Sequence, residues 1–443
     1  MLRTTLSTLV LLLTGTACSR AAAPERPSII LVSIDTLRAD HVGLYGYSRP
    51  TTPFLDRWSQ GGIVFERAFT TAAWTLVAHM TMLTGLFPDQ HGVYKKNKAL
   101  SPEIPLLAER LRAAGYRTHA LFLDGWISAR HGFDRGFDTF VKHADLAEAD
   151  RHLRTLLPKL ESEQPFFLFV HLFDVHCGDL SKDELPYQEP EPYQDQFVEN
   201  RAPLPPGPFG KYWEQPSPLS PEQLAHLTAL YDGGIRHVDE RLENWFGELE
   251  RRGLSRGALM IVTADHGEAL GEHGRLNQHG DSWQSALHVP LIVRAPDGAG
   301  AGKRIETPVH LGDIVPTALA AAGVARDAHL PGTSLLGPIP PARVIAGIKL
   351  PEAFVLKWPE KIVLEHTLSG RNYRATDLEQ DPDERSPRAG EPTRFDALRS
   401  EALGTMVFPQ PLQAEMSDTD RAKLDALGYG GDAKDEVRKT PPK

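Results

Sequence analysis

The hydrophobic positions of this chain fall into short unbroken runs that alternate with longer segments of helical spacing. The short runs are rich in β-branched and aromatic residues, which is the pattern of strands buried on both faces. Four such runs are predicted strands: 27–34, 117–123, 165–172 and 258–263. Three segments with helical spacing are predicted helices: 102–114, 145–160 and 221–250. This alternation predicts an α/β fold with a doubly wound, mostly parallel central sheet flanked by helices.

The pattern changes beyond Val293. A glycine-rich break at 298–302 and a predicted helix at 313–322 lead into residues 344–373, which alternate apolar and polar positions like a small antiparallel sheet. We therefore expect a small C-terminal antiparallel α+β subdomain after the large domain. The expected division is a large domain at 28–325, the subdomain at 326–431 and a disordered tail at 432–443.

One long segment, 178–218, has no clear periodicity. It is rich in proline, acidic and aromatic residues. Such a composition predicts a long loop laid over the edge of the sheet or over a pocket, where it would shape access to a site.

The N-terminus has the pattern of an export signal. Arg3 precedes an apolar run at 9–13, and small residues lead to Cys18. The run is too short to span a membrane. We expect a bacterial lipoprotein signal at 1–18, cleaved so that a lipidated Cys18 attaches the protein to the membrane through a tether at 19–27. Gly15 stands where such signals prefer a large aliphatic residue, so simple secretion is the alternative. Either way the protein is exported, as a periplasmic or outer-membrane lipoprotein or in secreted form.

The net charge limits the possible binding partners, and the cysteine content limits the possible disulfides. The formal net charge is −10 and no long basic run occurs, which argues against a nucleic-acid partner. Cys177 is the one other cysteine of the sequence, so an exported protein with an acylated Cys18 has no internal disulfide. Stability then comes from the core and from a metal.

Two polar turns carry the candidate metal ligands. Asp35 follows the first predicted strand, and the pair Asp265-His266 follows the fourth. In an open parallel sheet the carboxyl ends of strands form the ligand-binding edge, so these side chains can converge on one cation. Gly267 allows the backbone to turn tightly about an ion. Asp35 would alternatively be the N-cap of a following helix.

Thr75 is the candidate nucleophile, and a metal would stabilise its alkoxide. A helix-capping role for Thr75 is compatible with this, and the start of a helix would favour an anionic ester beside it. His79 lies one turn further on and faces the same side, where it could bind a substrate oxygen or take the proton.

Other histidines and two cations complete the candidate set. His176 and His279 are candidate acids or substrate-binding groups, because they lie after predicted strands; His171 and His273 also lie near such ends. Arg38 and Lys95 are candidate substrate-binding residues for a sulfate or phosphate, and their alternative is a solvated surface position.

These segments together resemble the sulfatase family of the alkaline phosphatase superfamily over most of the mature chain. Further matching segments follow in order: 52–56, 83–88, 91–93, 132–138, 231–233, 238–239, 289–293, 313–317, 377–382 and 427–429. The resemblance implies attack by a metal-bound nucleophile on the sulfur or phosphorus of an ester, with a covalent intermediate that water resolves. It assigns Asp35, Asp265 and His266 as ligands, and Thr75 as both nucleophile and ligand.

The chain departs from the family at important positions. The family signature Cys/Ser-x-Pro-Ser-Arg is replaced by Thr75-Leu76-Val77-Ala78-His79, so no formylglycine is expected. Thr36 replaces a second acidic ligand, and the usual lysine and histidine pair is missing around 124–126. His266 shifts the expected single divalent ion towards Mn²⁺ or Zn²⁺, with Ca²⁺ as the alternative. If Asp174 and His176 joined His279, they would form a second zinc site.

The expected function is therefore that of a metal-dependent hydrolase of sulfatase fold, a threonine-nucleophile variant. Its partner would be an anionic sulfate or phosphate ester. Two alternatives remain. One is a transferase for phosphoethanolamine or glycerophosphate groups, which would use the same covalent intermediate. The other is a catalytically silent binding protein of the same fold.

Overall fold

A mixed, mostly parallel sheet of eight strands forms the centre of the protein. The computed structural model describes residues 26–123, 125–177, 186–204, 219–276 and 281–414. The strand order is β10-β2-β9-β8-β1-β7-β5-β6. The strands are β1 (Ile29–Ile34), β2 (Ile63–Phe65), β5 (Arg117–Leu123), β6 (Thr139–His143), β7 (Phe166–Leu172), β8 (Leu259–Ala264), β9 (Leu291–Arg294) and β10 (Lys303–Ile305). Neighbours from β8 to β6 pair in parallel, whereas β9 is antiparallel to both β8 and β2. The predicted fold class is confirmed.

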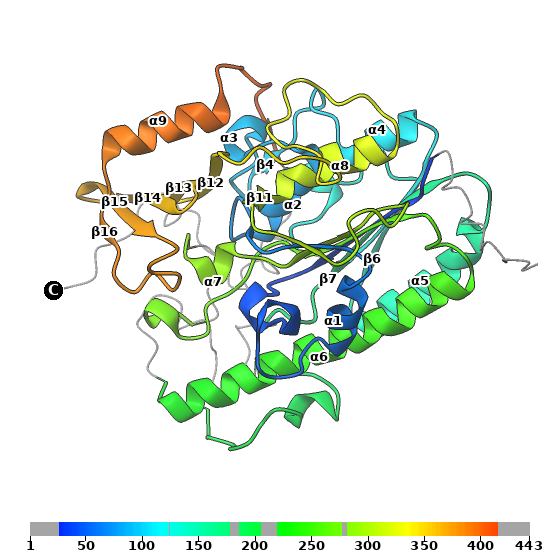
Figure 1. Ribbon diagram of the computed structural model, residues 1–443, viewed down its shortest axis with the longest axis horizontal. Coiled ribbons are helices and arrows are strands. Elements are labelled where there is room, and N and C mark those ends of the chain that lie inside the picture. Colours follow the sequence, from blue (N-terminus) through cyan, green and yellow to red (C-terminus); the bar gives the residue numbers. More distant parts are fainter. Residues whose placement is uncertain (1–25, 124, 178–185, 205–218, 277–280, 415–443) are drawn as a thin grey trace, which may run out of the picture.

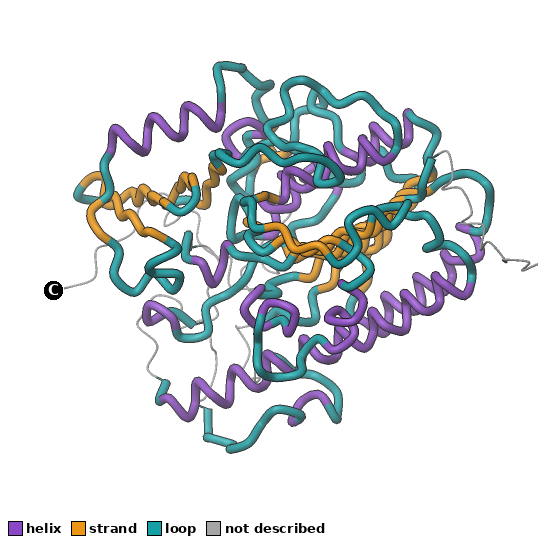
Figure 2. The backbone as a smooth tube through the Cα atoms, in the orientation of Figure 1, coloured by secondary structure: helices purple, strands orange, loops and turns teal. Residues whose placement is uncertain are grey.

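Helices cover both faces of this sheet (Figures 1 and 2). One face carries α1, α5 and the long α6, and the other carries α2, α4 and α8. The helices are α1 (Pro53–Ser59), α2 (Thr75–Thr84), α3 (Pro88–His91), α4 (Leu107–Ala113), α5 (Leu146–Leu160), α6 (Pro221–Arg251), α7 (Gln284–Leu287), α8 (Ile314–Ala321) and α9 (Pro392–Leu403). No helix among the described residues has the length and apolar character needed to cross a membrane.

The central strands are buried along their whole length. Every residue of β1, β7 and β8 is buried, which is why these strands read as continuous apolar runs in the sequence. Their side chains join one large core with those of the helices on both faces. The middle of the sheet is therefore a rigid base for the residues that follow β1 and β8.

The helix predicted at 102–114 was wrong at its start. It begins only at Leu107, because Pro105 disfavours helical geometry in the preceding residue and has no N–H to donate. The Glu109 side chain accepts a hydrogen bond from the backbone N–H of Leu106 at 2.8 Å, which caps the shorter helix.

The C-terminal part contains the predicted antiparallel sheet. Its five strands are β12 (Ile345–Lys349), β13 (Glu352–Lys357), β14 (Glu360–Thr367), β15 (Gly370–Asp377) and β16 (Arg388–Ala389). Helix α9 packs on one face of this sheet through Phe395 and Leu398. Two-strand pairs β3 (Ala68–Phe69) with β11 (Val309–His310), and β4 (Lys98–Ala99) with β17 (Leu412–Gln413), complete the described strands.

The described part of the predicted long loop, 186–204, comes before α6 in the chain and contacts this helix. It contains one short 3₁₀ turn, η4 (Tyr193–Asp195). Glu189 Oε2 lies 2.5 Å from His237 Nδ1, and the ring of Tyr193 stacks on His237. The remainder of that loop, the N-terminal signal with Cys18, and the C-terminal tail lie outside the described residues.

Candidate active site

Asp35 and Asp265 meet at the carboxyl edge of the sheet. They directly follow β1 and β8, which are adjacent parallel strands with Ile34 opposite Ala264. Both side chains are fully buried, as is His266. The convergence expected from the sequence is thus a consequence of strand pairing, because neighbouring parallel strands end side by side.

Thr75 joins this group from the first position of α2. Its Oγ1 lies 3.4 Å from Asp35 Oδ2 and 3.4 Å from His266 Nε2. His266 Nε2 lies 3.4 Å from Asp265 Oδ2 and 3.8 Å from Asp35 Oδ1. Asp35, Thr75, Asp265 and His266 are called the ligand cluster below.

The ligand cluster fits a divalent cation. Four ligands at about 2.1 Å from an ion in a tetrahedron lie about 3.4 Å from one another, close to the separations found here. Asp35 Oδ1 and Asp265 Oδ2 are buried and accept no hydrogen bond from the described part of the chain. Buried carboxylate oxygens without partners are costly, and a bound cation removes that cost.

The turn after β8 orients the ligand atoms of this cluster. His266 Nδ1 lies 2.9 Å from the carbonyl oxygen of Gly267, so Nδ1–H donates there and the Nε2 lone pair faces the cluster. Asp265 Oδ1 accepts from the backbone N–H of His266 at 2.8 Å and of Thr36 at 3.3 Å. Thr36 has a φ of 56°, a left-handed conformation that is strained for a β-branched residue.

Burial dominates the electrostatics of the cluster. It raises the pKa of Asp35 to about 6, although His266 and the Thr75 hydroxyl act in the opposite direction. Burial, followed by the charge of Asp35, also raises the pKa of Asp265. Two acids that resist ionisation in a dry site are strong candidates for charge compensation by a metal.

His79 lies one helical turn after Thr75. The ring nitrogens of His79 contact other groups and not the Thr75 hydroxyl. His79 Nδ1 is 2.9 Å from the backbone carbonyl oxygen of Thr75, and Nε2 is 3.0 Å from Ser33 Oγ. The side chain is fully buried, and burial lowers its pKa to about 3. In this arrangement His79 holds the first turn of α2.

His176 is buried near the cluster but stacks on Phe173 with a ring separation of 4.2 Å. Burial, then the charges of His266 and His171, lowers its pKa to about 3, so the ring is neutral at pH 7. Asp174 Oδ1 accepts a hydrogen bond from the backbone N–H of Leu146 at the start of α5. His279 lies outside the described residues.

Two overlapping groups of metal-ligating side chains occur in the described ranges. One is Asp35, Asp265 and His266; the other is His79, His171 and Asp265. Neither contains Asp174 or His176. The conditional second zinc site also needs His279, which lies outside the described residues, so it stays a prediction.

Arg38 is buried beside the turn after β8, where carboxylates hold it. Its guanidinium forms ion pairs with Asp40 at 2.7 Å and Glu272 at 2.8 Å, and donates to the carbonyl oxygen of Glu268 at 3.1 Å. It also lines a cavity of about 1030 Å³ together with Trp358 and His273. The expected alternative of a solvated position is wrong for Arg38, because it is only 4% exposed.

His273 is exposed and stacks on Trp283, with ring centres 3.7 Å apart.

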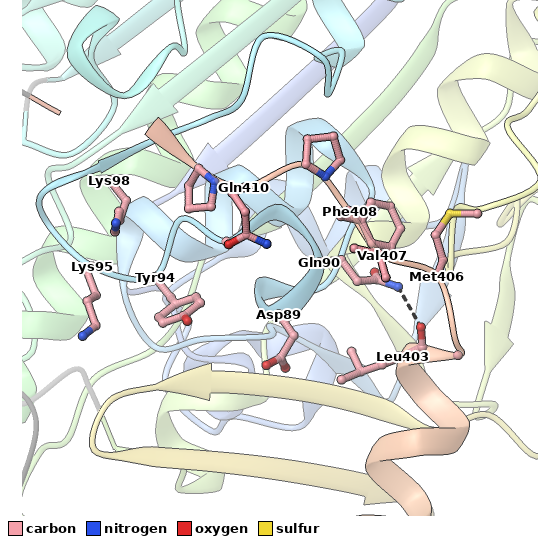
Figure 3. A pocket seen from close by; sticks show the side chains of 14 residues that line it. Asp89, Gln90, Tyr94, Lys95, Lys98, Leu403, Met406, Val407, Phe408 and Gln410 are labelled. Atoms are coloured by element: carbon pink, nitrogen blue, oxygen red, sulfur yellow. Dashed lines mark hydrogen bonds between the residues drawn. The ribbon is translucent and has the colours of Figure 1, made fainter. Parts of the chain in front are cut away.

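Lys95 lies in another pocket, shown in Figure 3. This pocket has a volume of about 550 Å³ and is closed on one side by the segment 403–411. Gln90 Nε2 donates to the carbonyl oxygen of Leu403 at its edge. None of the residues that line this pocket belongs to the ligand cluster.

The sequence reasoning assigned no role to two buried groups near the cluster. His171, the penultimate residue of β7, places Nε2 at 3.2 Å from Asp35 Oδ2. Glu268 is fully buried, and burial raises its pKa to about 8. The strand end before Asp174 already indicated His171 as a histidine near the site, whereas nothing local to the sequence distinguishes Glu268 from an exposed acid.

An α/β sheet with a buried Asp, Asp, His and hydroxyl group at its carboxyl edge is the arrangement that the resemblance to the alkaline phosphatase superfamily led us to expect. The sulfatase family profile matches residues 27–324, two-thirds of the sequence. The chain therefore belongs to the sulfatase family, and it is an enzyme of the class that hydrolyses sulfate and phosphate esters.

Relatives of known name agree with this family. The chain is 26% identical over 364 residues to the uncharacterized sulfatase YidJ of Escherichia coli K12, covering 70% of this chain and 71% of that protein. It is 23% identical over 431 residues to the Delta 4,5-hexuronate-2-O-sulfatase of Bacteroides thetaiotaomicron, covering 85% and 87%. The crystal structure of the phosphonate monoester hydrolase of Agrobacterium radiobacter shares the fold, with a TM-score of 0.68 and 20% identity over 88% of this chain and 100% of that one.

Proposed function

We propose that this protein is a metal-dependent hydrolase that cleaves a sulfate or phosphate ester with Thr75 as the nucleophile. The proposal is supported chiefly by one observation: the Thr75 hydroxyl lies 3.4 Å from both Asp35 Oδ2 and His266 Nε2. A hydroxyl at that position belongs to the ligand shell of any ion held there.

Asp35, Thr75, Asp265 and His266 would hold the ion. A bound divalent cation supplies positive charge that favours the alkoxide form of a hydroxyl and offsets charge on the ester oxygens. Two carboxylates, one imidazole and one hydroxyl suit Mn²⁺ or Zn²⁺ better than Ca²⁺, which prefers six to eight oxygen ligands.

Thr75 Oγ1 forms a bond to sulfur or phosphorus while the bond from that atom to the alcohol oxygen breaks. The Thr75 hydroxyl donates to Asp35 Oδ2, so this carboxylate is an acceptor within reach of the proton. The alcohol leaves with a proton from solvent, and water then attacks the ester on Thr75 and restores the hydroxyl. The N-terminus of α2 favours the anionic group beside Thr75 throughout.

A phosphate ester is the favoured substrate. A threonine side chain cannot be converted to the aldehyde through which formylglycine sulfatases release sulfate. An ester of phosphate on Thr75 can be hydrolysed by ordinary in-line attack of water. The phosphonate monoester hydrolase with the same fold is a precedent for phosphorus chemistry on this scaffold only, since its identity to this chain is low.

Matched nitrophenyl esters test the proposal. The Mn²⁺- or Zn²⁺-loaded protein is compared on the sulfate, the phosphate monoester and the phosphate diester, beside the variants Thr75→Ala and Thr75→Ser. We expect turnover of a phosphate ester that falls at least ~10³-fold in Thr75→Ala and is partly retained in Thr75→Ser. Unchanged turnover in Thr75→Ala would show that Thr75 is not the nucleophile.

The alternative functions give other outcomes in the same assay. A transferase would release nitrophenol faster when an alcohol acceptor is added, and the phosphoryl group would appear on that alcohol. A silent binding protein would bind the ion and show no turnover of any of the three esters.

A further inference from the structure

A layer of three buried polar side chains lies directly beneath the ligand cluster. It consists of Ser33, His79 and His171, none of which is more than 1% exposed, and it is called the polar layer below. Ser33 and His171 face each other in register across β1 and β7. The rings of His79 and His171 meet edge to face, with centres 4.7 Å apart. The layer therefore has no access to solvent or to an ester.

The hydrogen bonds of the polar layer indicate which ring nitrogens act as donors. His171 contacts Asp35 through Nε2, and His79 contacts the Thr75 carbonyl oxygen through Nδ1 and Ser33 Oγ through Nε2. His171 Nε2 lies 3.2 Å from Asp35 Oδ2, a carboxylate oxygen that only accepts, so Nε2–H is the donor in this contact. His79 Nδ1 faces the carbonyl oxygen of Thr75, so its proton is on Nδ1 and Ser33 Oγ donates to Nε2.

A second metal site in this layer is the competing explanation. One ring nitrogen of His79, one of His171 and a carboxylate oxygen of Asp265 lie within 4.8 Å of one another. A metal needs a lone pair on each nitrogen, yet both His79 nitrogens are engaged, Nδ1 as a donor and Nε2 as an acceptor. The observed contacts therefore favour donors over ligands.

We propose that His171 is a positioning residue that acts through Asp35. By donating to Oδ2, it fixes the rotation of the Asp35 carboxylate, so that Oδ2 faces the Thr75 hydroxyl and Oδ1 faces His266. His79 and Ser33 support the same arrangement by holding the first turn of α2. This inference rests on the proposed metal-dependent function and specifies how its ligand cluster is held.

The prediction is that loss of the His171 donor weakens Mn²⁺ binding. Outer partners of metal ligands typically contribute about 10–100-fold in affinity, so we expect His171→Leu to raise the Kd for Mn²⁺ by about that factor. His171→Gln places an amide N–H near the position of Nε2 and should recover most of the affinity. The measurement is chelator competition with Mn²⁺ alone, together with the number of ions bound per chain by elemental analysis.

His119→Leu is the matched control. His119 lies on the adjacent strand β5, is 6% exposed, and neither ring nitrogen has a hydrogen-bond partner in the described chain. The His119→Leu variant should have the same Kd for Mn²⁺ as the wild type. If His171→Leu does not fold, the pair His171→Gln and His171→Asn replaces it, because the shorter asparagine amide cannot reach Asp35 and should bind Mn²⁺ more weakly than glutamine.

Three results would overturn the proposal. They are an unchanged Kd in His171→Leu, equal Kd values for the glutamine and asparagine variants, and two ions per wild-type chain of which His171→Leu loses one. The last would make His171 a ligand. Because this assay needs no turnover, it stays decisive if Thr75→Ala keeps its activity and the proposed nucleophile is wrong.

Discussion

At the residue scale, Asp35 is a fully buried acid whose charge is only partly compensated by its neighbours. It has no exposed surface, and its Oδ1 accepts no hydrogen bond from any described residue. Its neighbours oppose the penalty of burial without removing it, so its pKa stays raised to about 6. An acid of this kind is destabilising to the metal-free fold and stabilising to the metal-bound fold.

This has a testable dependence on pH. The pKa of Asp35 rises from 3.8 in the unfolded chain to about 6 in the fold, so the native state binds its proton more tightly. The protonated Asp35 contributes to the free energy of unfolding fully below pH 3.8, and this contribution is lost as pH rises through about 6. A shift of about two pKa units corresponds to about 3 kcal/mol in that free energy. With a chelator present, Asp35→Asn should therefore be more stable than the wild type at pH 7, by up to that amount, and equal to it near pH 4.

Urea unfolding of both proteins at pH 4, 5.5 and 7 provides the measurement. The buried histidines have lowered pKa values and affect the pH dependence of stability with the opposite sign. Their contribution is the same in variant and wild type, so it cancels in the comparison. Added Mn²⁺ should reverse the order at pH 7, because the variant has lost a charged ligand. A stability difference that does not change with pH would refute this explanation.

At the scale of elements, the turn after β8 and helix α7 form one unit. The backbone N–H of Gly267 donates to the carbonyl oxygen of Ala286 at 2.9 Å. A Cβ on Gly267 would lie 2.0 Å from the carbonyl oxygen of Ser285 and 2.9 Å from Arg38 Cγ. Because His266 Nδ1 donates to the Gly267 carbonyl, this close approach also sets the position of a candidate metal ligand.

Gly267→Ala should therefore damage both stability and metal binding. The added methyl group forces α7 and the turn apart, and overpacking of this kind costs about 1–3 kcal/mol. Gly337→Ala is the matched control, since no atom lies within 4 Å of its Cβ, and it should change stability by less than about 0.5 kcal/mol. Thermal unfolding and the Kd for Mn²⁺ measure the two effects; a Gly267→Ala protein with normal values of both would contradict the close packing.

At the scale of the whole molecule, the C-terminal sheet holds the segment that leads into α7. Lys361 Nζ, on β14, donates to the carbonyl oxygen of Ser282 at 2.6 Å and to Glu384 Oε2 at 2.7 Å. Glu384 Oε2 also accepts from the backbone N–H of Gln284, and Glu352 accepts from that of Ser282. These buried charged residues contact the segment at the start of α7, and α7 in turn contacts the turn that contains His266.

Lys361→Met tests this connection. It leaves Glu384, which is 1% exposed, as a buried charge without its cation, and such a loss costs about 3–5 kcal/mol. Lys357→Met is the control on the same sheet, because Lys357 and its partner Glu401 are 30% and 48% exposed and their pair contributes about 0–1 kcal/mol. We expect Lys361→Met alone to weaken Mn²⁺ binding.

Combining Lys361→Met with Glu384→Gln removes the stranded charge and should recover part of the stability. Urea unfolding and Mn²⁺ titration of the three variants provide the comparison. Equal effects of Lys361→Met and Lys357→Met on both quantities would mean that the C-terminal sheet does not support the site.

The sequence by itself determined the strands of the sheet centre and the candidate metal ligands at their ends. Runs such as β1, β7 and β8 are buried on both faces, so their apolar character is continuous and local. Asp35 and the pair Asp265-His266 follow such runs directly, and adjacent parallel strands bring their ends together. These features depend only on short-range periodicity and on a general rule of sheet topology.

Only the tertiary structure decided which partner each polar group takes. Arg38 is held by Asp40 and Glu272 beside the turn, and the nitrogens of His79 face Ser33 and a backbone carbonyl. His171 reaches Asp35 because β7 pairs with β1, although the two residues are 136 positions apart. Such pairings follow from distances across strands and between layers, and a linear pattern of residue types holds no information about them.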